Sequence, residues 1–289
     1  MILHAPAKVN LCLFLGPPRT ADGRHQLVTV LEALSLADQL ELEFGAPADA
    51  VICPGVAGEN LALRALAGLR GLGWSAPPVR ITIDKRIPVA AGMGGGSSDA
   101  AAVLRLLDGP ERPLALARSL GADVPALIDP GLWLAGGAGD EDMTRFPGGL
   151  GEHAYLVLPS AHALSTADVY READRLGLGR SPAELAALMA RARAALGDAR
   201  RLPAELLVND LAPAALSLCP SIQDGLDALA GVGADTTMVS GSGPTTVGIF
   251  WGARARERAE TACATLASSV PGAATAVPFP APSQSEPVP

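Results

Sequence analysis

Two residue types that most proteins use freely are scarce in this chain of 289 residues. Lysine occurs only as Lys8 and Lys85, and the remaining basic residues are all arginine. Asparagine occurs only as Asn10, Asn60 and Asn209. Alanine, glycine, proline and arginine are abundant instead, which indicates a bias of the coding DNA rather than selection at each position. Under such a bias, a retained lysine or asparagine is a candidate functional residue.

Positive charge is also scarce. The chain has 22 basic and 30 acidic residues, and its formal net charge is −8. The chain has no run of Lys and Arg that could form the basic surface required by nucleic acid or an anionic membrane. It also has no apolar run of about 18 residues and no clean signal peptide, so we expect no membrane span and no export. Charge and hydropathy thus argue against nucleic-acid and membrane partners, and we expect a cytoplasmic protein that is a monomer or weak homodimer.

Cysteine is rare and dispersed, and aromatic residues make up only 3% of the chain. No CxxC pair or Cys/His ligand spacing is present, which argues against a zinc site. The four cysteines lie among apolar residues and are expected to be reduced thiols. Glycine and proline together stay below the fraction typical of low-complexity chains, and 49% of the residues are hydrophobic. The chain can therefore bury a sizeable core in each of two domains.

Hydrophobic periodicity gives the organisation of the chain. Alternation over the first 45 residues is typical of half-buried strands, and residues 79–83 form a further strand. Helical spacing appears at 59–72, with Asn60 as a possible cap, and again at 97–107 after a glycine-rich loop. Later segments follow the same logic. We expect helices at 114–120, 166–176, 181–196, 205–218, 221–230 and 253–267, and strands at 154–158, 236–240 and 245–251.

Strands mixed with runs of helices indicate an α+β protein in two domains rather than one doubly wound sheet. The glycine-rich stretch 136–151 is the expected boundary region. We place the N-terminal domain at 1–148, the C-terminal domain at 149–279 and a disordered proline-rich tail at 280–289.

The most specific segment is the run from Pro88 to Ala100, which contains four glycines and two serines between a strand and a helix. Backbone N–H groups at a helix start, together with the helix dipole, form a cradle for phosphate. The segment lacks the Gly-Lys-Ser/Thr of a Walker A loop and the third glycine of a dinucleotide fingerprint. The alternative is a tight turn in which Ser97 merely caps the next helix.

The pattern Pro88-x3-Gly92-x-Gly94-Gly-Gly-Ser-Ser98 resembles the phosphate loop of the GHMP kinase superfamily. Further blocks resemble one branch of that superfamily, which phosphorylates 4-diphosphocytidyl-2-C-methyl-D-erythritol. All three asparagines and both lysines fall inside these blocks, which occur in family order. The blocks are Pro6-Ala-Lys-Val-Asn-Leu11, Asp22-Gly-Arg-His25, Glu59-Asn-Leu61, Lys85-Arg-Ile-Pro88, Leu120-Gly-Ala-Asp-Val-Pro125, Asn209-Asp-Leu211 and Met238-Val-Ser-Gly-Ser-Gly243.

The resemblance implies a two-domain GHMP kinase fold, with an N-terminal ATP-binding domain and a C-terminal ferredoxin-like domain. It implies a small-molecule kinase of non-mevalonate isoprenoid biosynthesis that transfers phosphate from ATP, with Mg²⁺, to the 2-hydroxyl of the cytidine-diphosphate-linked sugar alcohol. The acceptor is expected between the domains, where water is excluded from the transferring phosphoryl group.

Lys8 and Asp123 are the predicted catalytic pair. Phosphoryl transfer to a hydroxyl needs stabilisation of the transferring group and a residue that orients or accepts the hydroxyl proton. The resemblance assigns Asp123 as the base and Lys8 as its charged partner. Taken alone, Asp123 could equally be a turn residue and Lys8 a solvated strand residue.

The nucleotide side is assigned by the same resemblance. The glycine loop would hold the β- and γ-phosphates, and either Ser97 or Ser98 would meet Mg²⁺. For Asn60 the helix-cap interpretation stands beside ligand contact. The predicted nucleotide residues are Asn60, Lys85, Pro88, Gly92, Gly94, Gly95, Gly96, Ser97 and Ser98.

The acceptor side contains one departure from the branch. Its Asp-Gly-Tyr-His block uses the tyrosine to stack on cytosine, and this chain has Arg24 at that position, followed by His25. A guanidinium plane can stack on a base as well. The remaining predicted acceptor residues are Asn10, Thr166 and Tyr170, and Tyr170 could instead be a core aromatic.

Segment 240–243 is expected to be a turn that could close over the acceptor. Two alternatives to the leading interpretation are a GHMP kinase for another small alcohol, such as homoserine or a mevalonate derivative, and a catalytically silent nucleotide-binding protein. Arg24 is the feature against cytidine, while Lys8 and Asp123 argue against loss of catalysis.

Overall fold

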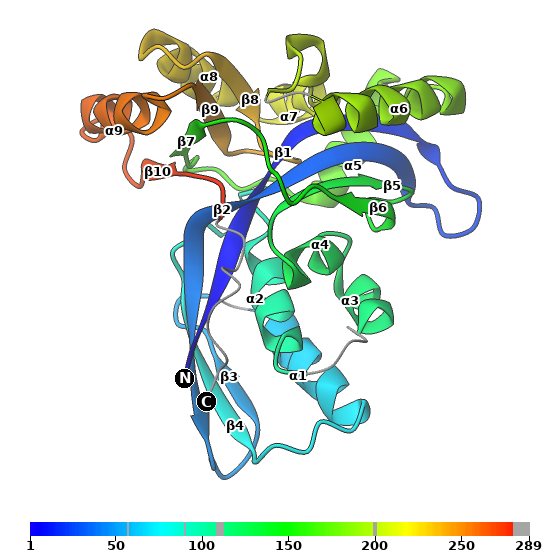
Figure 1. Ribbon diagram of the computed structural model, residues 1–289, viewed down its shortest axis with the longest axis vertical. Helices are drawn as coiled ribbons and strands as arrows, with labels where there is room; N and C mark the ends of the chain where they lie inside the picture. Colours follow the sequence, from blue (N-terminus) through cyan, green and yellow to red (C-terminus); the bar gives the residue numbers. More distant parts are fainter. Residues whose placement is uncertain (57, 90, 108–112, 199–200, 280–289) are drawn as a thin grey trace.

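The computed structural model describes residues 1–56, 58–89, 91–107, 113–198 and 201–279. These residues form two β-sheets and the helices that cover them (Figure 1). The predicted tail at 280–289 lies outside the described residues.

The larger sheet is built around two long strands, β1 (Ile2–Pro18) and β2 (His25–Phe44), which pair in antiparallel register. Their hydrophobic residues alternate or run continuously, and both strands are buried over most of their length. β2 also pairs with β4 and β5, so the six strands join in the order β3-β4-β2-β5-β6 with β1 beside β2. The other strands are β3 (Ala50–Ile52), β4 (Val79–Asp84), β5 (Leu132–Gly136) and β6 (Glu141–Arg145).

The helices between β3 and β5 in the chain pack together beside the lower part of this sheet (Figure 1). Alanine-rich α2 is almost entirely buried and packs against α1, α4 and β1, because small side chains allow close approach. The helices are α1 (Leu61–Gly71), α2 (Gly95–Leu104), α3 (Leu114–Leu120) and α4 (Val124–Ile128).

The second sheet is antiparallel throughout, with the order β10-β7-β9-β8. If these strands are numbered one to four along the chain, they stand in the sheet in the order four, one, three, two. Helices connect the first strand to the second and the third to the fourth, which is the ferredoxin-like arrangement. The strands are β7 (His153–Leu158), β8 (Thr236–Val239), β9 (Thr246–Trp251) and β10 (Ala274–Ala276). The helices are α5 (Thr166–Leu176), α6 (Pro182–Asp198), the 3₁₀ turn η1 (Ala204–Leu206), α7 (Ala212–Leu218), α8 (Ile222–Gly231) and α9 (Ala255–Leu266).

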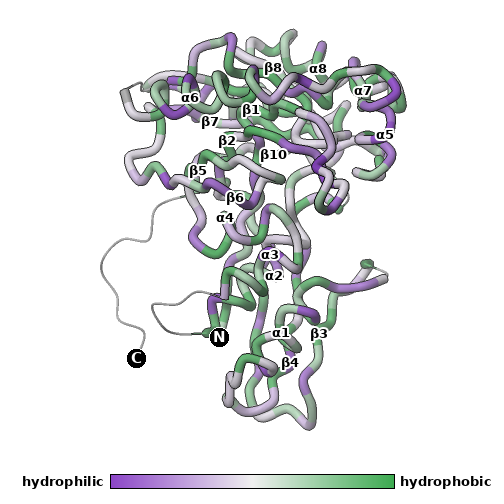
Figure 2. The backbone as a smooth tube through the Cα atoms, turned by 90° about the vertical axis from the view of Figure 1, so that its right-hand side faces the viewer, coloured by the Kyte–Doolittle hydropathy of each residue, from purple (hydrophilic) through white to green (hydrophobic). Residues whose placement is uncertain are grey.

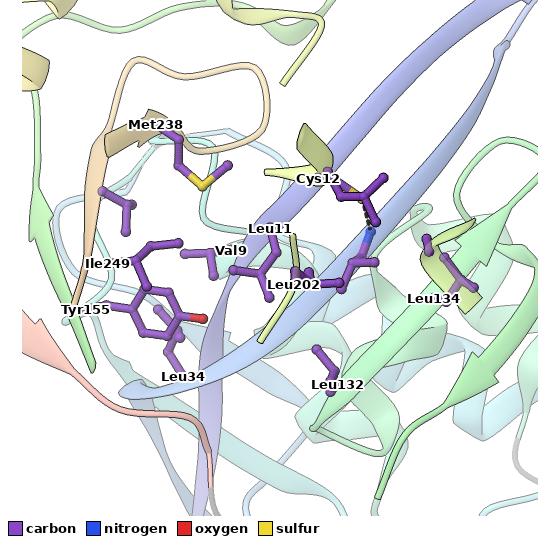
Figure 3. Close-up of a cluster of buried hydrophobic side chains, with 14 of the residues drawn as sticks. Val9, Leu11, Cys12, Leu34, Leu132, Leu134, Tyr155, Leu202, Met238 and Ile249 are labelled. Atoms are coloured by element: carbon purple, nitrogen blue, oxygen red, sulfur yellow. Dashed lines mark hydrogen bonds between the residues drawn. The ribbon is translucent and has the colours of Figure 1, made fainter. Parts of the chain in front are cut away.

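The two sheets share a hydrophobic core, which fixes their relative position. Val9 and Leu11 of β1 belong to the same buried cluster as Tyr155 of β7 and Ile249 of β9 (Figure 3). In the view turned by 90°, β1 and β2 run among the elements of the second sheet, while β3, β4 and α1 lie at the opposite end (Figure 2). The two long strands therefore contact the lower helices at one end and the second sheet at the other.

Most predicted elements are confirmed within a few residues, and one is wrong. The helix expected at 205–218 is interrupted, because the chain forms η1, then a parallel bridge between Asn209 and Leu13, and only then α7. Asn209 accepts a hydrogen bond from the Leu211 N–H and donates to two carbonyls outside the segment, which outweighs the helical pattern. No helix in the described part of the chain is long and apolar enough to cross a membrane.

Candidate active site

A cavity of about 480 Å³ lies between the glycine-rich loop before α2 and the loop joining β8 to β9. Elements of both domains form its walls. Among the predicted site residues, it is lined by Lys8, Asn10, Asn60, Lys85, Pro88, Gly92, Gly94, Gly95, Gly96, Ser97, Asp123, Thr166 and Tyr170. The predicted nucleotide and catalytic residues, which are far apart in the sequence, are thus brought to one cavity.

The glycine loop opens α2 with Gly94 in the left-handed conformation, at φ 69°. A Cβ on Gly94 would stand 2.9 Å from Lys8 Cγ, so only glycine leaves room for the lysine stem. The first N–H groups of α2 have no partner within the helix and carry its positive dipole end. Gly95, Gly96 and Ser97 of this first turn line the cavity, which gives it the character of a phosphate site.

The structure corrects the prediction that the Ser98 side chain contacts the nucleotide or Mg²⁺. Its side chain is fully buried, its hydroxyl donates to the Pro6 carbonyl at 2.6 Å, and its N–H donates to Gly94. Ser98 therefore attaches α2 to β1 and is turned away from the cavity. Ser97 is half-buried and lines the cavity, so of the two serines it is the one available to a ligand.

Lys8 and Asp123 meet at the wall of the cavity. Lys8 projects from β1, and its backbone N–H donates to the Met93 carbonyl of the glycine loop at 3.0 Å. Its Nζ lies 3.4 Å from Asp123 Oδ2, with the lysine side chain 6% exposed and the aspartate 31% exposed. Asp123 stands at the N-terminus of α4. The pair thus combines a nearly buried ammonium with a carboxylate that solvent or a substrate can reach.

Asn10 lies on the same strand two residues from Lys8, and both side chains point to the cavity. Lys8 Nζ donates to Asn10 Oδ1 at 2.7 Å, and Asn10 Nδ2 donates to Thr29 Oγ1 at 2.8 Å. All three residues are at least nine-tenths buried. Asn10 therefore orients the Lys8 ammonium in addition to facing the cavity.

Lys85 stands beside two carboxylates that the sequence alone did not reveal. Its Nζ donates to Asp38 and, at 2.8 Å, to Asp99. Burial opposes the charge on Lys85, but Asp99 and Asp38 outweigh it and raise the pKa of the lysine. Burial raises the pKa of Asp99, and Lys85 offsets only part of that effect. Asp99 lines the cavity, and its Oδ1 has no hydrogen-bond partner.

The position of Asn60 is compatible with both predicted roles, helix cap and ligand contact. Its side chain accepts a hydrogen bond from the Ala62 N–H at 2.8 Å and so caps α1. The residue also lines the cavity, so the cap and a contact with a ligand are compatible.

Two of the predicted acceptor residues form an aromatic pair. The His25 and Tyr170 rings lie with centroids 5.1 Å apart, and His25 Nε2 is 2.8 Å from Asp174 Oδ1. Burial, with Asp123 nearby, raises the pKa of Tyr170 to about 12, so its phenol stays neutral. Tyr170 lines the cavity, while His25 stands behind it.

Arg24 does not line the cavity. Its guanidinium donates two hydrogen bonds of 3.1 Å to Asp140 Oδ2 and one of 3.1 Å to the Ala138 carbonyl. These bonds fix the orientation of the guanidinium plane. The Arg24 side chain remains 41% exposed. Stacking of Arg24 on a base stays a prediction.

The loop between β8 and β9 closes the cavity from the second domain. Thr166 Oγ1 at the start of α5 lies 3.0 Å from Ser242 Oγ. Asn209 Nδ2 donates to the carbonyls of Val239 and Gly241, at 2.8 and 2.7 Å. A Cβ on Gly241 would stand 3.2 Å from Lys8 Nζ, so this loop approaches Lys8 directly.

The contributions of Asp38, Asp99 and Thr29 were missed because one sequence gives no signal for them. Each becomes informative only when strands and α2 pack together. Asn209 did carry a signal, its rarity, but nothing in the sequence indicated which carbonyls it would bind.

The fold and the cavity are those of a phosphotransferase. Residues 60–127 match the GHMP kinases N terminal domain family, and residues 185–268 match the GHMP kinases C terminal family. A homoserine kinase structure from Cytophaga hutchinsonii, at 16% identity, covers 96% of this chain with a TM-score of 0.61, which shows a shared fold. The chain is therefore a GHMP kinase.

Closer relatives narrow the class. The 4-diphosphocytidyl-2-C-methyl-D-erythritol kinase of Streptomyces coelicolor is 39% identical over 95% of this chain and 97% of its own length. That of Mycolicibacterium gilvum is 41% identical over 84% of this chain and 80% of its own. A crystal structure of 4-(cytidine 5'-diphospho)-2C-methyl-D-erythritol kinase, 32% identical, matches with a TM-score of 0.75 over 96% of this chain and all of its own. The chain belongs to the 4-diphosphocytidyl-2-C-methyl-D-erythritol kinase family.

Proposed function

We propose that the chain transfers the γ-phosphoryl group of ATP to the 2-hydroxyl of 4-diphosphocytidyl-2-C-methyl-D-erythritol, in non-mevalonate isoprenoid precursor biosynthesis. The observation that carries the proposal is one cavity with three parts: the Lys8–Asp123 pair, a helix N-terminus with phosphate-site character, and the Tyr170–His25 pair. The 39% identity to the Streptomyces coelicolor relative over nearly the whole chain supports the acceptor.

In this reaction Asp123 orients the acceptor hydroxyl and takes its proton as the new P–O bond forms and the bond to the β-phosphate breaks. The Lys8 ammonium, 3.4 Å away, holds that carboxylate in position before transfer. It also meets the charge on the equatorial oxygens of the transferring group. The first turn of α2 holds the phosphates so that the γ-phosphoryl group faces the hydroxyl.

Mg²⁺ would neutralise phosphate charge when bound. Its preferred ligands are oxygens, and in nucleotide sites the protein supplies only a few of them. The Ser97 hydroxyl and the unpaired Oδ1 of Asp99 are suitable oxygens on the cavity wall. Among the described residues, no group of three or more His, Cys, Asp or Glu side chains could hold a metal ion.

Cytosine binding is assigned to the Tyr170 ring, backed by His25, with Arg24 as a neighbouring planar group. Base–aromatic stacking contributes about 1–3 kcal/mol per base. Thr166 and Asn10 supply polar contacts to the acceptor. We place the reaction in the cytoplasm, with the enzyme as a monomer or weak homodimer.

The deciding experiment is ATP consumption by the purified protein with three acceptors: the cytidine-linked erythritol, homoserine and phosphomevalonate. We expect turnover with the first alone. Activity confined to homoserine or phosphomevalonate would replace this proposal by the other GHMP kinase interpretation, and binding of ATP without turnover on any acceptor would indicate a silent nucleotide-binding protein.

A further inference from the structure

The hydrogen-bond chain behind Lys8 ends on Thr29, a residue of β2 that is 4% exposed. Thr29 Oγ1 donates to the Cys12 carbonyl at 2.7 Å and accepts from Asn10 Nδ2 at 2.8 Å. Asn10 Oδ1 in turn accepts from Lys8 Nζ at 2.7 Å. The β1–β2 register is irregular between Asn10 and Cys12, where this chain of bonds crosses from one strand to the other.

A hydroxyl has a single hydrogen, so each bond in this chain sets the direction of the next. Because Thr29 gives its hydrogen to Cys12, its oxygen can only accept from Asn10. The amide must therefore present its NH₂ group to Thr29 and its oxygen to Lys8. The flipped amide would set NH₂ against the lysine ammonium, two donors in a buried site with no acceptor between them.

We propose that Thr29 is a positioning residue for phosphoryl transfer, which acts through the Asn10 amide to hold the Lys8 ammonium beside Asp123. The inference rests on the proposed function. It also explains why a polar side chain occupies a strand position whose neighbours, Val28 and Val30, are apolar and buried.

Thr29→Val tests the proposal because it removes the hydroxyl and keeps the shape. We expect kcat to fall roughly tenfold, the loss of about one hydrogen bond to transition-state stabilisation, while KM for ATP stays within about twofold. Thr29→Ser restores kcat because it restores the hydroxyl. The matched control is Thr246→Val, the same change at a buried threonine of β9 that does not line the cavity. This control retains wild-type kcat.

A second comparison separates action through Asn10 from direct contact with substrate, since Thr29 also lines the cavity. In an Asn10→Ala background, Thr29→Val should leave kcat unchanged within about twofold, because the residue through which Thr29 acts is gone. The double variant removes both hydrogen-bond partners together. Its comparison with Asn10→Ala therefore remains informative if Thr29→Val alone does not fold. A further drop in the double variant, a wild-type kcat for Thr29→Val, or failure of Thr29→Ser to restore kcat overturns the proposal. An inactive wild-type protein would refute the proposed function instead.

Discussion

At the scale of single residues, the functional signal came from the side chains that compositional bias left in place. Both lysines and Asn10, Asn60 and Asn209 line the cavity or bind the loop that closes it. What no single sequence could supply is the set of partners. Asp38 lies 47 residues from Lys85, and nothing in local spacing indicates that the two side chains meet.

Asp123→Asn should lower kcat by about 10²–10⁴-fold, because the amide cannot accept the hydroxyl proton. ATP affinity should be nearly unchanged, since the glycine loop and Lys85 do not depend on Asp123. Steady-state turnover and nucleotide titration measure the two effects. Wild-type turnover in the folded variant would remove Asp123 from the role of base.

Tyr170→Leu should raise KM for the cytidine-linked acceptor by roughly tenfold or more, from loss of stacking. KM for ATP is expected to stay constant, because the proposed role of Tyr170 is in binding the acceptor. If both constants move together, the change reflects disturbed packing of α5 rather than lost base contact.

At the scale of elements, long periodic segments were predicted well, and the elements that were missed are short. α5 lies where its pattern placed it, whereas β3 (Ala50–Ile52) and β10 (Ala274–Ala276) are only three residues long and carry too few positions for a period to show. The error at 205–218 has another cause. There, the side-chain bonds of Asn209 and Asp210 to distant backbone groups override local helical preference.

The contact between the glycine loop and the β8–β9 loop gives a test at this scale. Gly92 has φ 72°, and a Cβ there would stand 2.2 Å from the Ser240 carbonyl oxygen. Gly92→Ala should therefore lower the free energy of unfolding by about 1–3 kcal/mol or more, measured by urea denaturation. The control is Gly73→Ala, at φ 91° with nothing within 4 Å, which bears the backbone cost alone. Equal losses in the two variants would mean that the loops do not touch in solution.

At the scale of the whole molecule, the two domains are joined by polar as well as apolar contacts. His153 of β7 places its Nε2 2.7 Å from Glu32 Oε2 of β2, and the Tyr155 hydroxyl donates to the same carboxylate. The His153 ring also lies 4.8 Å from the Trp251 ring, centroid to centroid. The histidine is thus a buried link between the two sheets.

Burial disfavours the charged imidazole, but Glu32 outweighs it, and the pKa of His153 is raised in the folded protein. A raised pKa stabilises the fold fully below the unfolded value of about 6.5, and this contribution is lost as the pH rises through the folded pKa. We expect the difference in unfolding free energy between wild type and His153→Gln to be largest near pH 6 and to shrink toward pH 9. Urea denaturation across this range measures it, and a pH-independent difference would contradict the charged pair.

The shared core has a consequence for how the chain is made. Val9, near the start of the chain, packs in one cluster with Ile249 and Ala276, and Phe279 returns to donate its N–H to Ala33 of β2. During synthesis β1 therefore leaves the ribosome well before Ile249 and Ala276, and its apolar face is fully covered only when they have been made. Contacts between such distant positions slow folding, because the intervening loop must close first. During synthesis β1 and β2 are the segments most in need of protection from aggregation.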